Sequence, residues 1–249
     1  MRILADHEAG HAIAFSSQPD LGSIRKVTIM PRGGAGGFMA PLSREEMFFD
    51  RSRFEQQLVV AFGGRIAEKR LTGTISSGAS NDLKQATGLA EEVGPSMTGT
   101  GGEEFVAWGS DSGPVFLGGE ISRRKDFSEE TARELEAQVS AILSSAYETT
   151  QQVIDENWTA VQGVAEALLQ RETVDGQLIQ EAYDRARAGS SPQDIADWIV
   201  GETVATEKRL EAAEQAAREK EAAEQEKRQA DVDLRKPIEK RPTAEGSSS

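Results

Sequence analysis

Apolar side chains recur three and four positions apart in several stretches of this chain, which is the period of a helix with one buried face. Residues typical of helix ends separate the stretches, among them Gly94-Pro95, Gly189 and Ser191-Pro192. The apolar positions are Phe54, Leu58, Phe62 and Ile66; Leu135, Val139, Ile142, Leu143 and Tyr147; Val153, Ile154, Trp158, Val161, Ala165 and Leu168; Leu178, Ile179, Ala182 and Tyr183; Ile195, Trp198 and Ile199. The pattern predicts a mainly helical chain.

Several helix starts are also marked. Ser52 with Glu55 has the spacing of a capping box, and Ser128 followed by two glutamates predicts another start. A short helix is expected over Asp82–Val93, because the following glycine and proline end it.

Strand-like segments are short and few. Each is bounded by glycine or proline, as is common for short strands. They are Ile24–Met30, Gly37–Pro41, Glu104–Trp108 and Val115–Leu117. The predicted fold class is therefore mainly α with a small β-sheet (α+β).

Composition changes near residue 202. Beyond it the chain is rich in Ala, Glu, Lys, Arg and Gln, and oppositely charged residues four apart, such as Glu214 and Arg218, favour a solvated helix over Glu207–Arg228. The end has two prolines and a Gly-Ser terminus, which favours disorder. We predict a folded domain at 1–188, a linking helix at 189–210 and a charged tail at 211–249.

Overall charge and composition argue against several classes of protein and of metal site. The 249 residues carry 28 Lys and Arg against 42 Asp and Glu, a formal net charge of −14, which disfavours binding to nucleic acid. There is no cysteine, so any metal must be held by histidine and carboxylate. No apolar run approaches the roughly 20 residues needed to cross a bilayer. A cytoplasmic location is expected, with membrane association only through a partner.

The two histidines of the chain form one motif, His7-Glu8-Ala9-Gly10-His11. Side chains four apart lie on one face of a helix, so both imidazoles can reach a single ion while the glutamate acts on bound water. This is the HExxH pattern of zinc peptidases. Two incidental histidines on an amphipathic helix are the alternative.

A catalytic zinc needs three protein ligands and an open position for water. The third ligand must here be Asp or Glu, and spacing alone does not choose among them. Asp82 follows a glycine-containing turn at the start of a predicted helix. An aspartate in a first helical turn is also favoured by the helix dipole without any metal.

Six motifs, in order, resemble the peptidase domain of the FtsH family of ATP-dependent zinc metalloproteases. They are His7-Glu8-Ala9-Gly10-His11, Val27-Thr28-Ile29-Met30-Pro31-Arg32-Gly33, Gly63-Gly64-Arg65-Ile66-Ala67-Glu68, Ser77-Gly78-Ala79-Ser80-Asn81-Asp82, Val115-Phe116-Leu117-Gly118 and Ser128-Glu129-Glu130-Thr131-Ala132-Arg133. The resemblance runs from residue 2 to about residue 187. It implies that His7, His11 and Asp82 bind zinc and that Glu8 is the general base.

The family also has membrane helices, an ATPase module and a six-membered ring. This sequence has no GxxxxGK phosphate loop. The resemblance implies a homohexamer. Without a phosphate loop of its own, the chain is expected to act on unfolded proteins or peptides. Its expected partners are a separate AAA ATPase or full-length FtsH-type subunits. The chain is also expected to be a fragment, a split gene product or the result of a mis-assigned start, since its first residue lies so close to His7.

Two further residues and one pair of segments have two interpretations each. Glu68 either orients a zinc-bound imidazole or forms a surface salt bridge, the second being favoured. Asp6 replaces the aromatic residue usual in the family, and it either favours protonated His7 or faces solvent. The segments Val27–Met30 and Gly37–Ala40 either pair with an extended substrate or only pack in the sheet.

Two functions follow. The first is a zinc metalloendopeptidase that cleaves unfolded proteins. The second is a non-hydrolytic FtsH-like subunit that assembles with or regulates a complete protease. The presence of Glu8 beside His7, His11 and Asp82 favours the peptidase, because a scaffold has no use for the base.

Overall fold

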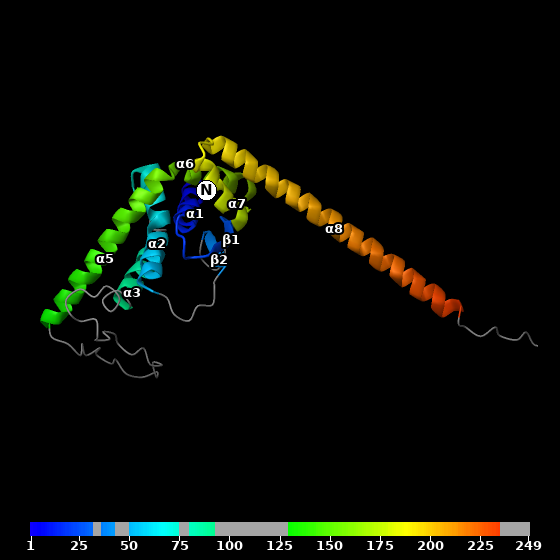
Figure 1. Cartoon of the computed structure of the whole chain (residues 1–249), viewed down its shortest axis with the longest axis horizontal. Helices are drawn as coiled ribbons and strands as arrows, with labels where there is room; N and C mark the ends of the chain where they lie inside the picture. The colour runs from blue at the N-terminus through cyan, green and yellow to red at the C-terminus, as the bar shows by residue number, and fades with distance from the viewer. Residues whose placement is uncertain (32–35, 43–49, 75–79, 93–128, 235–249) are drawn as a thin grey trace, which may run out of the picture. The chain divides into compact units, whose positions relative to one another are not determined.

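The computed structural model describes residues 1–31, 36–42, 50–74, 80–92 and 129–234 (Figure 1). The elements in chain order are α1 (Arg2–Ser16), β1 (Ser23–Thr28), β2 (Phe38–Leu42), α2 (Arg51–Thr72), α3 (Ser80–Glu92), α5 (Glu129–Glu156), α6 (Trp158–Arg171), β3 (Thr173–Asp175), α7 (Gly176–Arg187) and α8 (Pro192–Leu234). Helices dominate and the strands form one small sheet, which confirms the predicted fold class. By their contacts the residues divide into two units, Met1–Thr203 and Val204–Ser249.

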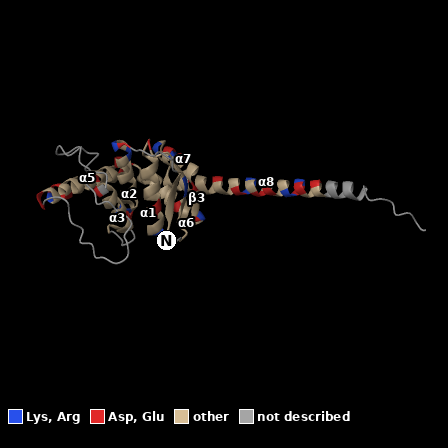
Figure 2. Ribbon diagram, turned by 90° about the horizontal axis from the view of Figure 1, so that it is seen from below, with Lys and Arg blue, Asp and Glu red and all other residues tan. Residues whose placement is uncertain are grey.

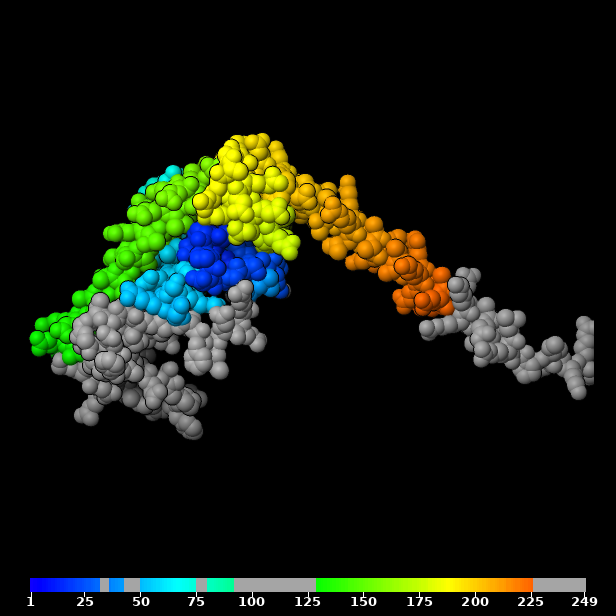
Figure 3. All heavy atoms as spheres, viewed as in Figure 1, coloured from blue at the N-terminus to red at the C-terminus, as the bar shows by residue number. Residues whose placement is uncertain are grey.

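Helix α1 is the centre of the first unit. It packs against α2, α6, α7 and β1, and every residue from Ala5 to Ala14 is buried. On the face drawn in Figure 3, the visible part of α1 (blue) is bordered by α2 (cyan) and α7 (yellow-green). A helix buried on all sides presents its polar residues to the interior. Both histidines of the chain therefore lie inside the domain.

The sheet has the strand order β2-β1-β3, and both pairings are antiparallel. Val27 in the central strand lies opposite Met39 of β2 and Val174 of β3. Its side chain is fully buried, as is that of Val174, so the sheet closes one side of the core. Among the described strands, β2 and β3 are the two outer strands, and each pairs on one side only.

The predicted strands at Ile24–Met30 and Gly37–Pro41 correspond to β1 and β2. Those predicted at Glu104–Trp108 and Val115–Leu117 lie outside the described residues. No sequence pattern predicted β3. With only three residues between two helices, β3 has too little alternation to be recognised, and its pairing with β1 makes it a strand.

The N-cap of helix α2 lies two positions before the predicted one. The carboxylate of Asp50 accepts a hydrogen bond from the Arg53 amide at 2.9 Å, so Asp50 is the N-cap and the capping box at Ser52 was wrong. Aspartate and serine cap helices about equally well, and the point where the chain turns decides between them. The Ser52 hydroxyl instead donates to Asp20.

The predicted helix that began near Val153 is divided between two elements. Val153 and Ile154 belong to the end of α5, the chain breaks at Asn157, and α6 begins at Trp158. Apolar spacing continues across the break because both helices contribute to one core, which hid the boundary in the sequence.

The predicted start of the last helix at Pro192 is confirmed, and α8 runs without interruption to Leu234. In the second unit, every side chain from Thr206 to Gln225 is exposed, and acidic and basic residues alternate along the helix (Figure 2). The predicted pair of Glu214 and Arg218 is present at 3.8 Å. None of the described helices is both long and apolar enough to cross a membrane.

Candidate metal centre

Two close helix contacts build the site. His7 and His11 lie one turn apart on α1, and α2 crosses α1 beside them. The crossing is tight because Gly10 and Gly63 face each other, and a methyl group placed on Gly10 would lie 2.5 Å from the Gly63 carbonyl oxygen. Helix α3 packs on α2 and brings Asp82 in its first turn to the same place.

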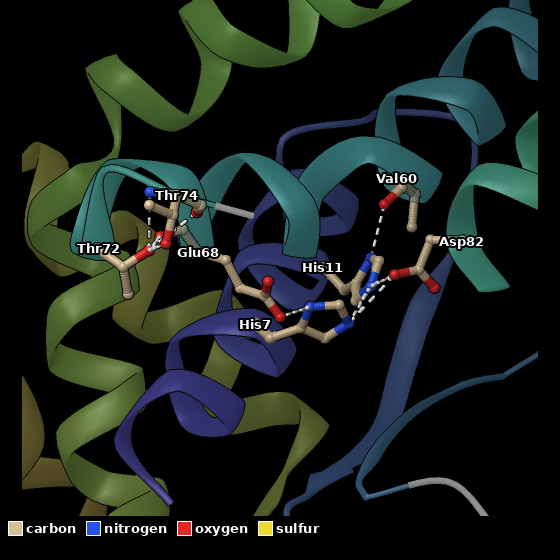
Figure 4. Close-up of polar contacts among 7 residues, drawn as sticks. All are labelled: His7, His11, Val60, Glu68, Thr72, Thr74 and Asp82. Atoms are coloured by element: carbon tan, nitrogen blue, oxygen red, sulfur yellow. Dashed lines mark hydrogen bonds and ion pairs between the residues drawn. The ribbon is translucent and has the colours of Figure 1, made fainter. Parts of the chain in front are cut away.

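Three potential ligand atoms converge there (Figure 4). The Nε2 atoms of His7 and His11 are 3.1 Å apart. Asp82 Oδ2 lies 3.2 Å from Nε2 of His7 and 3.5 Å from Nε2 of His11. Among the described residues, this is the only group of His, Asp and Glu side chains whose ligand atoms meet closely enough to hold one metal ion.

Both imidazoles are oriented by α2. His11 Nδ1 lies 2.7 Å from the carbonyl oxygen of Val60, and His7 Nδ1 lies 3.0 Å from Glu68 Oε1. A carbonyl oxygen only accepts, so His11 Nδ1 carries the proton and donates to Val60. The contact of His7 Nδ1 with the Glu68 carboxylate is an ion-pair distance, and a carboxylate facing Nδ1 favours a proton there. In the neutral ring the lone pair is then on Nε2, the atom that faces Asp82.

Glu68 is therefore not on the surface, and the favoured prediction of a surface salt bridge was wrong. Only 3% of Glu68 is exposed, and its carboxylate lies against His7. The periodicity of α2 does not distinguish the two outcomes, because burial of this face depends on the crossing with α1.

Electrostatics at the site favour an ionised aspartate. Burial raises the pKa of Asp82, but the close approach and charge of the His11 and His7 imidazoles outweigh it and lower the pKa well below its usual range. Burial lowers the pKa of His7, but the contact with Asp82 and the nearby carboxylates of Glu8 and Glu68 raise it overall. The group thus combines one ionised carboxylate with two imidazoles, and a metal ion would take the Nε2 positions in place of protons.

Glu8 lies between the histidines in sequence and is buried, with 5% of its surface exposed. Its carboxylate touches the chain just before β2, since a methyl group on Gly37 would lie 2.9 Å from Glu8 Oε1. Burial raises the pKa of Glu8, and the charges of His11 and His7 offset part of this. A buried glutamate of raised pKa beside a cluster of metal-ligand type is suited to proton transfer.

Asp6 takes neither of the two roles considered from the sequence. It is fully buried and turns away from the site, where its Oδ2 accepts a hydrogen bond from Arg2 Nε at 2.7 Å. Arg2 also donates to Glu166 of α6 at 2.6 Å. Asp6 thus belongs to a charged contact that ties the first turn of α1 to α6.

The structure places His7, His11 and Asp82 side by side, with Glu8 on the same helix as the two histidines. Nothing in the sequence indicated Val60, which contributes only a carbonyl oxygen. Every residue has a backbone carbonyl, so the residue type at position 60 does not predict this contact. The sequence did contain one weak signal for a close contact in this part of α2. Gly63 and Gly64 are consecutive glycines inside a predicted helix, which is unfavourable unless close packing requires them.

A helix with paired histidines, an intervening glutamate and a carboxylate from another helix is the arrangement of metal-dependent peptidases. The family model for "Peptidase family M41" matches residues 1–182. The chain therefore belongs to peptidase family M41.

Its relatives include several proteins named ATP-dependent zinc metalloprotease FtsH. The ATP-dependent zinc metalloprotease FtsH of Chloroflexus aggregans is 36% identical over 199 residues, covering 74% of this chain and 29% of the relative. FtsH 3 of Synechocystis sp. is 39% identical, covering 72% and 30%, and FtsH of Kosmotoga olearia is 33% identical, covering 91% and 35%. The chain spans about a third of the length of these relatives.

Proposed function

We propose that this chain is a zinc-dependent metalloendopeptidase, in which His7, His11 and Asp82 hold the metal and Glu8 is the general base. The observation that carries the proposal is the convergence of the two Nε2 atoms and Asp82 Oδ2 on one point, with separations of 3.1, 3.2 and 3.5 Å.

These separations fit zinc. Ligands at the usual zinc distances on the corners of a tetrahedron are about 3.3 to 3.5 Å apart. Two neutral imidazoles and one carboxylate are also a ligand set found at catalytic zinc sites, where a fourth position stays open for water. Asp82 Oδ2 is buried and, among the described residues, faces only the two imidazole nitrogens. A cation at this point would satisfy it.

The metal, when bound, lowers the pKa of a water toward about 7 and polarises the scissile carbonyl. Glu8 then accepts the proton of the attacking water and passes it to the leaving amine nitrogen. Burial raises the pKa of Glu8, which makes its carboxylate a stronger base and its protonated form easier to retain between the two transfers. Val60 and Glu68 hold the two imidazoles in place meanwhile.

Strand β2 supports a binding mode for extended substrates. It is an edge strand among the described strands, and Gly37, the residue before it, touches Glu8. An extended peptide that adds to this edge brings its backbone past the base, with main-chain hydrogen bonds that do not depend on sequence. We therefore propose unfolded proteins and peptides as substrates.

Folded substrates need an energy source. The relatives are named ATP-dependent, and this chain spans about a third of their length. Within the printed sequence there is no GxxxxGK phosphate loop. We propose that unfolding is supplied by an AAA ATPase, on a separate chain or in full-length FtsH-type subunits, with which this domain forms a hexameric ring.

Hydrolysis of an unfolded, fluorophore-labelled casein tests the activity. The parent chain with zinc and without ATP is compared with Glu8→Gln, and Glu148→Gln, an exposed position on α5, is the matched control. We expect the parent and Glu148→Gln to cleave and Glu8→Gln to bind zinc without cleaving. Zinc binding without cleavage by the parent, even after an AAA ATPase partner is added, would instead favour the non-hydrolytic FtsH-like subunit.

A further inference from the structure

Helix α2 carries two adjacent glycines, Gly63 and Gly64, in its interior. Glycine in a helix interior is less favourable than alanine because it loses more backbone freedom on folding. Both are buried at the crossing with α1, yet they face different parts of that helix. The two glycines therefore have separable roles.

Gly63 faces backbone. A methyl group placed on it would lie 2.7 Å from the carbonyl oxygen of Gly10 and 2.9 Å from Cβ of Ala14. Neither atom can move aside unless the helices separate. Gly63 therefore sets the distance between α1 and α2, which is a structural role.

Gly64 faces the two imidazoles. A methyl group on it would lie 2.5 Å from His11 Nε2, 2.7 Å from His7 Cε1 and 2.8 Å from His11 Cδ2. All three nearest atoms belong to the rings, and one of them is a ligand atom of the candidate site. A ring can rotate away from the methyl group, but it then loses its Nδ1 contact with Val60 or Glu68.

We propose that Gly64 is a positioning residue of the metal centre. Its missing side chain leaves the space in which the rings of His7 and His11 lie with both Nε2 atoms toward Asp82. This inference rests on the proposed zinc site. It adds that the site requires an empty position on α2 as well as the ligands on α1 and α3.

Zinc affinity and metal-free stability are measured separately on the full chain. Zinc is titrated against a chromophoric chelator, and the melting temperature is recorded by circular dichroism in excess EDTA. For Gly64→Ala we expect zinc binding about tenfold weaker or more, as for other changes around metal ligands, with the metal-free protein still folded. Gly63→Ala should lower the melting temperature. Gly88→Ala, whose methyl group would meet no atom within 4 Å, should leave zinc affinity unchanged.

A second background isolates the cause. In a chain that already carries His7→Ala and His11→Ala, the rings are absent, so Gly64→Ala should raise the melting temperature through its better helix propensity. A lower melting temperature of Gly64→Ala both with and without the two histidines would mean that Gly64 serves helix packing, and this would overturn the proposal. Unchanged zinc affinity in Gly64→Ala would also overturn it. If the parent itself binds no zinc, the proposed function fails, whereas the comparison of backgrounds still decides whether the rings require Gly64.

Discussion

Glu68 Oε1 lies 3.0 Å from His7 Nδ1, and both side chains are buried where α2 crosses α1. A carboxylate that accepts from the far nitrogen of a metal-binding imidazole fixes the orientation of the ring and makes the ligand more basic. The contact joins a residue of the HExxH helix to one in the Gly-Gly-Arg-Ile-Ala-Glu stretch of α2. Two motifs separated in the sequence thus act on one imidazole.

Replacement of Glu68 should therefore weaken the metal site. We expect Glu68→Ala to lower zinc affinity by about ten- to a hundredfold, and Glu68→Gln to lower it less because its amide oxygen still accepts. Competition with a chelator measures both. Glu148→Gln controls for the loss of one negative charge, and an equal effect of Gln and Ala would count against the hydrogen-bond role.

Asp82 is the proposed ligand from α3. Its Oδ2 faces both Nε2 atoms, so Asp82→Ala should reduce zinc affinity by at least about a hundredfold, more than the loss of an outer partner. Zinc content after dialysis provides the measurement. The exposed neighbour Asn81 serves as the control, and Asn81→Ala should keep its zinc. A full complement of zinc in Asp82→Ala would point to another third ligand.

Gly37 packs on the proposed base. A methyl group there would lie 2.9 Å from Glu8 Oε1 and 2.6 Å from the carbonyl oxygen of Thr28. Gly37→Ala should displace the carboxylate and lower kcat by about ten- to a hundredfold, while zinc stays bound, since the displaced group is not a ligand. Gly36→Ala, which meets only the side chain of Leu4 at 3.3 Å, is the matched control. Loss of zinc in Gly37→Ala would contradict this separation.

The edge of β2 makes a prediction about substrates. In a strand added to an edge, alternate amides point toward the sheet. N-methylation of a peptide substrate should therefore raise KM at every second position and have little effect between them. Steady-state kinetics on a series of singly methylated peptides test this. A uniform effect along the peptide would mean that β2 does not pair with the substrate.

Helix α8 begins with a cap that contains a titratable carboxylate, Asp194. The carboxylate of Asp194 accepts from the Ser191 hydroxyl at 2.7 Å, and these hydrogen bonds lower the pKa of Asp194 from its ordinary value of 3.8. A lowered pKa in the folded state contributes stability above the unfolded value, and this contribution is lost as the pH falls through the folded value. Asp194→Asn should thus melt below the parent at pH 7, and the difference should shrink below about pH 4.

Thermal melts of the two proteins from pH 7 to pH 3 measure that difference. Asp197→Asn, an exposed position on the same helix that does not contact Ser191 in the cap, is the control for the change of charge. A difference in melting temperature that does not change with pH would show that the charge of Asp194 does not contribute and that only its hydrogen bonding matters.

Local patterns in the sequence predicted the elements that depend on neighbouring residues. The spacing of His7 and His11 puts both on one face of α1, and the periodicity of apolar residues located most helices. The predicted bounds of elements were wrong where contacts with residues distant in the sequence determine them. The three-residue β3 exists because β1 pairs with it, and the cap of α2 lies at Asp50 because the chain turns there.

By itself, then, the sequence determined the fold class and the placing of His7, Glu8 and His11 on one helix, because helical spacing is a property of adjacent residues. Only the tertiary structure decided which carboxylate meets them, that Glu68 is buried against His7, and that Gly64 faces the rings. The physical reason is that α2 and α3 reach α1 through packing. The distance at which helices pack depends on side-chain volume at the crossing, which no local pattern records.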